Sequence, residues 1–207
     1  MTDFATLTSE VLDDLKRSDL TAQAQTKIKN AIKFYSRRKF WFLEQRSTTT
    51  LIDGQEYYGL PADFRDESSL VITVNNWTYP LNKRTYEILE AWFVKSATFT
   101  GYPTDYAIYD EQLRLHPIPN GSHVMTLSYY KELPVLGAGT DSNAWTDEGS
   151  ELIKARAEKI LYAQTIRDRQ SATFMAGVER EELVQHESLT NARLMTGHSK
   201  KRGVTRN

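Results

Sequence analysis

The sequence predicts an α+β protein in which N- and C-terminal helices form one bundle and an antiparallel β-rich module is inserted between them. Near both ends of the chain, apolar residues recur at spacings of three and four, which is typical of amphipathic helices. Residues 47–131 instead alternate apolar and polar side chains between turn signals, which is typical of strands. Since helices at both ends can share a core, we expect the two ends to pack together.

These patterns divide the chain into four parts, the last of which is a flexible basic tail. The parts are a discontinuous helical bundle (1–46 and 146–195), the inserted β module (47–132), a connector (133–145) and the C-terminal tail (196–207). Glycines and polar residues mark the connector, and Trp145 is expected to anchor its end.

Two helices are predicted before the β module. The first starts near Phe4, with Asp3, Thr6 or Thr8 as its cap, and ends near residues 17–19. The second is expected over about 21–42. Segment 21–46 has the most one-sided charge of the folded part, with Glu44 as its only acid. Its cations are Lys27, Lys29, Lys33, Arg37, Arg38, Lys39 and Arg46.

The β module is expected to contain strands at about 47–52, 70–74 and 77–81, then a short helix over 86–94. Asn75-Asn76 allows the chain to reverse between two of these strands. Three further alternating runs within 101–134 predict an antiparallel meander with one apolar face. Between the first two runs, Asp110-Glu111 predicts a four-residue loop, because neither residue readily tolerates positive φ in a two-residue turn.

The C-terminal part is expected to begin a helix at 146–150, with an interruption at 168–171. A final helix over 172–195 follows, and Gly197 ends it. Its apolar stripe is weak. The stripe consists of Phe174, Val178, Leu189 and Ala192.

Composition is that of a soluble globular protein, with 40% apolar and 26% charged residues. The net charge of -1 disfavours a global nucleic-acid binder, and the absence of cysteine excludes disulfides and thiolate chemistry. No run is long and apolar enough for a membrane helix, and residues 1–17 do not form a secretory signal. We therefore expect a soluble protein kept in the cytoplasm of the cell that makes it.

No arrangement of residues predicts catalysis. The four histidines share no helical register with carboxylates, and His116 and His123 are interpreted as exposed strand ends rather than a zinc site. Adjacent acids such as Asp13-Asp14 point in different directions on a helix and are not acid/base dyads. Nucleophile-elbow, phosphate-loop and dinucleotide fingerprints do not occur. The sequence predicts no enzyme, no metal site and no cofactor.

The remaining signals each allow more than one interpretation. The tyrosines and tryptophans of the module could stack nucleic-acid bases, but residues 47–145 carry twelve acids against six bases, so core and subunit-interface roles are favoured. The cations of the basic helix could form an ordinary solvated face or meet acids of a neighbouring subunit. They could also face a DNA channel, through Lys27, Lys33, Arg37 and Arg38. Of these interpretations, we favour ion pairs between the cations of the basic helix and acids of the last helix. Those acids are Glu179, Glu181, Glu182 and Glu187.

A family resemblance covers about residues 40–145. Segment 101–134 contains, in order, Gly-Tyr-Pro, Tyr-Ala-Ile, Leu-Arg-Leu-His-Pro-Ile-Pro-Asn-Gly and Leu-Ser-Tyr-Tyr-Lys-Glu-Leu-Pro. Phe-Trp-Phe-Leu-Glu-Gln-Arg (40–46) and Asp-Gly-Gln-Glu-Tyr-Tyr-Gly-Leu-Pro-Ala-Asp-Phe (53–64) precede it. By order and spacing, this pattern resembles the head-to-tail adaptor proteins of short-tailed bacteriophages.

The resemblance implies a virion protein at the head–tail junction, made in the host bacterial cytoplasm. Family members form a dodecameric ring between the portal protein and the tail nozzle or tail fibre proteins, around a channel for genomic DNA. The tail is then the portal-docking arm, through Lys200, Lys201, Arg202, Val204 and Arg206. An inert disordered terminus is its other interpretation. The alternative function is sequence-independent nucleic-acid binding by helix 21–46, which requires its cations to gather on one uncovered surface.

Overall fold

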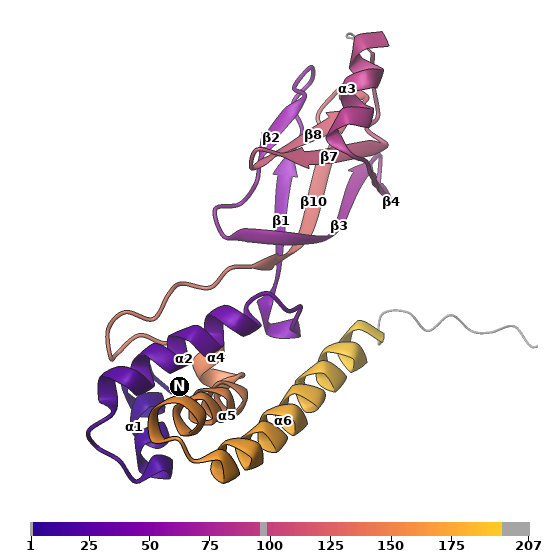
Figure 1. Ribbon diagram of the computed structural model, residues 1–207. Coiled ribbons are helices and arrows are strands. Elements are labelled where there is room, and N and C mark those ends of the chain that lie inside the picture. The colour runs from indigo at the N-terminus through magenta and orange to yellow at the C-terminus, as the bar shows by residue number, and fades with distance from the viewer. Residues whose placement is uncertain (1, 96–98, 196–207) are drawn as a thin grey trace, which may run out of the picture. The chain divides into compact units, whose positions relative to one another are not determined.

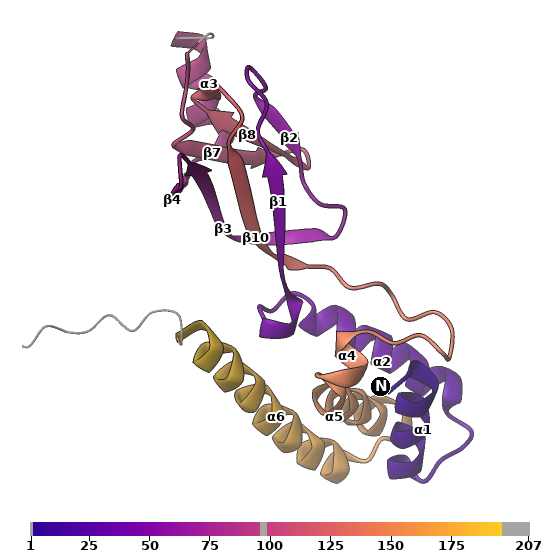
Figure 2. The ribbon, with the colours of Figure 1, turned by 180° about the vertical axis from the view of Figure 1, so that it is seen from behind.

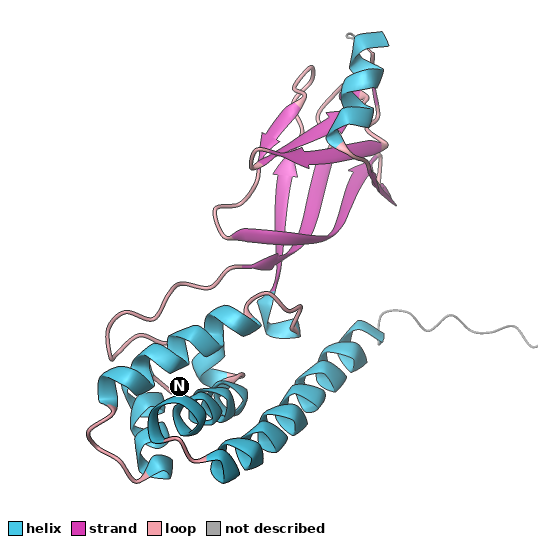
Figure 3. Cartoon of the chain, viewed as in Figure 1, coloured by secondary structure: helices cyan, strands magenta, loops and turns pink. Residues whose placement is uncertain are grey.

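The protein is a mixture of helices and mostly antiparallel strands, as the ribbon and the cartoon show (Figure 1, Figure 3). The computed structural model describes residues 2–95 and 99–195. The predicted α+β class is confirmed. The chain divides into two compact units. One contains the residues up to Leu43 and from Leu133 onward, and the other is Glu44–Glu132.

The helical unit is organised around α5 (Ser150–Ile160), against which α1 (Phe4–Leu15), α2 (Thr21–Tyr35) and α6 (Arg169–Met195) all pack. Figure 2 shows α5 among these helices, with the short α4 (Ala144–Asp147) beside it. A 3-10 turn at Trp41–Leu43 and a π-helical segment at Leu161–Ile166 complete the unit. Small and aliphatic side chains fill the core. They include Leu7, Val11, Ala24, Ile28, Ala31, Leu152, Ile153, Ala157 and Leu161.

The start of α1 is fixed by its cap and by the connector. The Asp3 carboxylate accepts a hydrogen bond from the Thr6 amide at 2.7 Å, as one of the predicted caps. The Phe4 and Ala5 amides donate to the carbonyls of Asp141 and Gly139, both at 2.9 Å. A Cβ at position 139 would lie 3.3 Å from the Ala5 Cβ, so glycine permits this close approach. The end of the connector is therefore part of the helical unit's framework.

The prediction that the second helix reaches residue 42 is wrong, because α2 ends at Tyr35. The Ser36 hydroxyl donates to the Lys33 carbonyl, and the chain turns so that Phe40 and Phe42 stack at 5.5 Å. Both rings pack edge-on against Trp145, whose exposed fraction is 1%. Trp145 is the anchor that was predicted, and burial of this aromatic cluster outweighs the helical continuation.

The predicted apolar stripe of the last helix is also wrong. Phe174 is 71% exposed and Leu189 is 53% exposed, whereas the buried face of α6 carries Glu179, His186 and Thr190. The expected interruption is confirmed, slightly earlier than predicted. Arg167 has φ 64°, and Asp168 accepts from the amides of residues 170 and 171 to begin α6 at Arg169.

The β unit consists of two four-stranded sheets that enclose one core. The first sheet has the order β1 (Glu44–Thr50), β10 (Val124–Lys131), β3 (Phe64–Val74), β4 (Trp77–Pro80). The second has the order β2 (Tyr57–Gly59), β8 (Gln112–His116), β7 (Asp105–Tyr109), β5 (Asn82–Lys83). A two-stranded parallel pair joins β6 (Thr100–Gly101) to β9 (Ile118–Pro119), and α3 (Tyr86–Lys95) packs beside β7. Core residues from both sheets include Leu70, Ile72, Leu113, Leu115, Met125 and Leu127.

The predicted three-strand meander is confirmed for its first two strands and wrong for the third. Strands β7 and β8 pair antiparallel, but β10 lies in the other sheet, between β1 and β3. Segment 117–119 contains two prolines, which lack the amides needed to extend a ladder, and it carries β9 instead of a simple reversal. The alternating apolar face of β10 is confirmed, with Met125, Leu127 and Tyr129 each at most 5% exposed.

The four-residue loop expected at Asp110-Glu111 is wrong as well. Tyr109 pairs directly with Gln112, and both intervening residues adopt left-handed conformations, with φ 51° and 57°. This is the geometry of a two-residue hairpin turn, which matches the twist of the flanking strands. The Leu60 amide donates to the Glu111 carbonyl at 3.2 Å and holds the turn. The Asn75-Asn76 reversal has the same geometry and is confirmed, with φ 48° and 66°.

Candidate interaction sites

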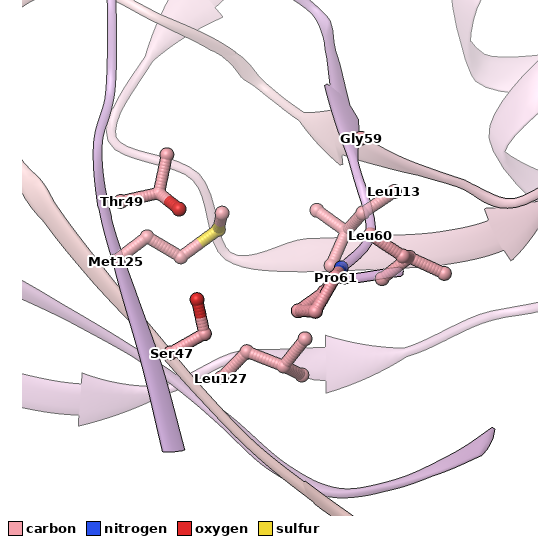
Figure 4. Close-up of a pocket in the computed structure, with 8 residues that line it drawn as sticks. All are labelled: Ser47, Thr49, Gly59, Leu60, Pro61, Leu113, Met125 and Leu127. Carbon is pink, nitrogen blue, oxygen red and sulfur yellow. The ribbon is translucent and has the colours of Figure 1, made fainter. Parts of the chain in front are cut away.

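The β unit contains a cavity of about 190 Å³ between the edge strands of its two sheets, which we call the β1–β2 seam. Figure 4 shows Ser47 and Thr49 of β1 on one side and Gly59, Leu60 and Pro61 on the other. The remaining lining residues come from β8 and β10. They are Leu113, Met125 and Leu127. All eight lining residues are uncharged, so the seam suits an apolar group with one or two hydroxyls beside it.

Strand β1 offers an open backbone edge beside this cavity. It ends the sheet order, and all of its residues except Ser47 are exposed. The Leu51 amide donates to the His123 carbonyl at 2.7 Å, and hydrogen bonding alternates along an antiparallel strand. The peptide groups of Arg46, Thr48 and Thr50 therefore point away from β10, toward the free edge. Their amides and carbonyls can pair with an added strand.

A buried arginine fastens α3 to the second sheet. The Arg114 guanidinium forms ion pairs with Glu56 and Glu90, and its side chain is 8% exposed. It also lies 4.0 Å from the centre of the Phe93 ring. Burial by itself lowers the pKa of Arg114, but the two carboxylates raise it above its ordinary value. The cluster keeps the Arg114 charge paired inside the unit, while the Glu90 side chain remains 45% exposed.

A second buried charge cluster joins α2, α5 and α6 in the helical unit. The Tyr35 hydroxyl donates to Glu179 at 2.5 Å, the Arg156 guanidinium donates at 2.7 Å, and the Lys159 ammonium also pairs with this carboxylate. Burial alone would raise the pKa of Glu179, but these three donors hold it below its ordinary value. Position 186 continues the same polar face, where the two His186 ring nitrogens contact the carbonyls of Glu182 and Glu148.

The four predicted site cations of segment 21–46 differ in their contacts. Lys27 donates to Gln164 at 2.8 Å, and Arg38 pairs with Glu187 at 2.5 Å. Lys33 and Arg37 are exposed. The expected ion pairing between this segment and the last helix thus occurs at Arg38, whereas the cations that pair with Glu179 are Arg156 and Lys159 of α5. The predicted tail residues Lys200, Lys201, Arg202, Val204 and Arg206 lie outside the described residues.

The outer face of α6 exposes apolar side chains that the bundle leaves uncovered. Phe174, Val184 and Leu189 are 71%, 57% and 53% exposed. Solitary exposed apolar residues are common, but three bulky ones on one helix suit a contact with another molecule. Phe174 and Leu189 belong to the stripe that the sequence pattern predicts to be buried. The polar residues at 179, 186 and 190 form the buried face instead, and their helical spacing was the available signal for it.

Across residues 2–95 and 99–195, no cluster of histidine and carboxylate side chains could hold a metal ion. The two histidines interpreted as exposed strand ends lie among aromatic rings instead. The centre of the His116 ring lies 5.0 Å from that of Phe93 and 5.1 Å from that of Trp92. The ring centres of His123 and Tyr102 are 5.2 Å apart. Burial lowers the pKa of His116, so its imidazole favours the neutral form. Within the same described ranges, no helix has the length and apolarity to cross a membrane.

The exposed apolar side chains of α6 and the open edge of β1 are both features that suit contacts with other proteins. A family model described as SU10 adaptor protein matches residues 2–195. The chain therefore belongs to this adaptor family, in agreement with the head-to-tail adaptor resemblance of its sequence. A comparison with curated proteins finds no match. As a phage structural adaptor, the chain is a virion component that associates with other virion proteins.

Proposed function

We propose that the chain is the head-to-tail adaptor of a short-tailed phage, a structural protein and not an enzyme. Copies form a dodecameric ring at the head–tail junction, joining the portal protein to tail nozzle or tail fibre proteins around a channel for genomic DNA. The protein is made in the host bacterial cytoplasm. The family match over residues 2–195 carries this proposal, because it covers both the helical unit and the β unit.

The outer face of α6 is proposed as a contact between neighbouring copies. Native mass spectrometry of the protein, alone and mixed with its portal, tests ring formation. Phe174→Glu places a charge on this face and should reduce the assembled fraction at least tenfold while circular dichroism stays unchanged. Val135→Glu is the matched control, because Val135 is 82% exposed in the same unit and belongs to the connector rather than to α6. A protein that stays monomeric with and without portal would refute the ring.

The C-terminal tail is proposed as the portal-docking arm, through the cations at 200–202 and 206 together with Val204. Truncation after Met195 removes all of them and leaves the described residues intact. The truncated protein should keep its circular dichroism spectrum and lose portal binding in gel filtration. If it binds portal as well as the full chain, the arm has no part in docking.

Exposure of Lys33 and Arg37 favours a role near DNA for the segment that also contains Lys27 and Arg38. Within the ring, these cations would line the channel or a subunit interface. Alone, they would give sequence-independent nucleic-acid binding, which is the second candidate function. Binding measured by gel shift between 50 and 200 mM salt separates the two, since affinity through phosphate contacts falls steeply with salt. The absence of any shift at low salt removes the second candidate.

A further inference from the structure

We propose that the β1–β2 seam is a docking groove for an extended segment of a different virion protein. The segment adds a strand to β1 and inserts one aliphatic side chain into the cavity. The nature of the partner rests on the proposed adaptor function, whereas the groove itself rests on the geometry of the β unit. Strand addition of this kind obtains affinity from backbone hydrogen bonds and specificity from pockets for alternate side chains.

The backbone of β1 supplies all the hydrogen-bonding groups that an added strand needs. Arg46, Thr48 and Thr50 each direct an amide and a carbonyl away from β10, at the two-residue spacing of an antiparallel ladder. Long exposed edges are usually blunted by proline, by a bulge or by a run of charges. Segment 47–50 is Ser-Thr-Thr-Thr and has none of these, and its register with β10 is regular throughout. This edge can accept a strand without rearrangement.

The cavity defines the anchoring side chain. Its volume of about 190 Å³ is larger than the ~150 Å³ of an engineered apolar cavity that binds benzene. Five of its eight lining residues are Leu, Met or Pro. Since a charged group placed there would lose its hydration without a partner, the anchor must be neutral and apolar, with the size of leucine or methionine.

The chain's own tail is a poor occupant, because Val204 is its single bulky apolar residue. In an extended strand, Arg202 and Arg206 point the same way as Val204. Inserting Val204 would therefore force two arginines onto the uncharged seam.

A second copy fits no better. The outward backbone positions of β4, the other edge of this sheet, include Pro80, which has no amide to donate. A second β1 would offer only the hydroxyls of Ser47 and Thr49 to the cavity. The occupant is therefore a neutral, alternating segment of another protein.

Two substitutions separate the parts of the groove. Thr48→Pro removes an outward amide without breaking the ladder to β10, and Ser47→Leu fills the cavity, into which Ser47 points (Figure 4). Thr48→Ala keeps the amide and is the first control. Thr78→Pro makes the same change on the free edge of β4 and is the second.

Binding is measured on the full-length protein by fluorescence anisotropy. The probe is a labelled nonapeptide of alternating serine and threonine with a central leucine. Its companions carry a central aspartate or reproduce residues 198–207 of this chain. We expect the leucine peptide to bind at least tenfold more tightly than either companion. Thr48→Pro and Ser47→Leu should each weaken binding at least tenfold, with both controls unchanged. The proposal is overturned by no binding at millimolar peptide, by equal binding of the aspartate peptide, or by tighter binding of the tail peptide.

Assembled particles identify the occupant. A photoreactive benzoylphenylalanine at position 48, followed by mass spectrometry, should cross-link to a virion protein other than this chain. A cross-link to a copy of this chain, or no cross-link, overturns the partner assignment. Thr48→Pro should still bind portal in gel filtration. If the wild-type protein itself does not bind portal, the adaptor function is refuted, whereas the result of the peptide-binding experiment still stands.

Discussion

Replacing Glu158 with glutamine should make the helical unit more stable at neutral and alkaline pH and leave it nearly unchanged at pH 5. Glu158 lies on α5 and is 4% exposed. Burial is the main cause that raises its pKa from 4.5 to about 8, and the Asp14 carboxylate of α1 raises it further through charge and a hydrogen bond. Lys154 opposes this shift, but its ammonium already pairs with Glu10 and Glu151 at 3.1 and 2.8 Å.

The direction of this pH dependence follows from the number of protons that the folded and unfolded states bind. Between pH 4.5 and 8 the folded state keeps a proton on Glu158 that the unfolded chain has lost, so stability falls as pH rises through this window. Each pH unit changes the free energy of unfolding by about 1.4 kcal/mol, so the loss between pH 5.5 and 7.5 is at most ~3 kcal/mol. Glutamine still donates a hydrogen bond to Asp14 and does not titrate. The advantage of Glu158→Gln should therefore grow across this window and level off above pH 8.

Urea denaturation followed by circular dichroism at 222 nm measures this advantage for both proteins at pH 5, 6, 7 and 8. The helical signal reports mainly on the helical unit, which contains every long helix of the described residues. Asp14→Asn serves as a second variant, because removing the neighbouring carboxylate should flatten the wild-type pH dependence. An advantage of the same size at all four pH values would refute the buried-proton argument.

Three further substitutions test other features of the two units. Arg114→Met leaves Glu56 and Glu90 without their cation and should lower the free energy of unfolding of the β unit by about 2–3 kcal/mol, measured by near-UV circular dichroism during denaturation. Glu111→Gly relieves a left-handed backbone and should raise the urea midpoint, with a gain of about 0.5–1 kcal/mol. Tyr35→Phe removes one donor to Glu179. It should cost about 1–2 kcal/mol at pH 7 and move acid-induced unfolding to higher pH, because the pKa of Glu179 then rises.

Local patterns were enough to predict the α+β class, most helices and the hairpin strands. Apolar spacing located α1, α3 and the break before α6, and Trp145 was recognised as an anchor. Pairing between distant segments left no local signal. The run at 124–131 could be identified as a strand, but its placement between β1 and β3 depends on contacts with residues 44–50 and 64–74. The predicted meander failed for this reason.

The candidate sites were harder to predict. The apolar pattern of the last helix predicts that its apolar residues lie inward. Tyr35, Arg156 and Lys159 instead contact Glu179, so the polar side of α6 is the buried one. The seam was missed because Ser-Thr-Thr-Thr predicts a strand without predicting that the strand ends a sheet. Which cations remain exposed likewise depends on partners that are distant in the sequence, such as Gln164 for Lys27.

The strands by which the chain enters and leaves the β unit are direct neighbours, since Glu44 pairs with Tyr130. Both junctions with the helical unit therefore lie about one strand spacing apart, ~5 Å. An exchange of residues 44–132 between related genomes would therefore need only two adjacent junctions to replace the whole β unit. Natural recombination can thus give the same bundle a new β unit in a single event.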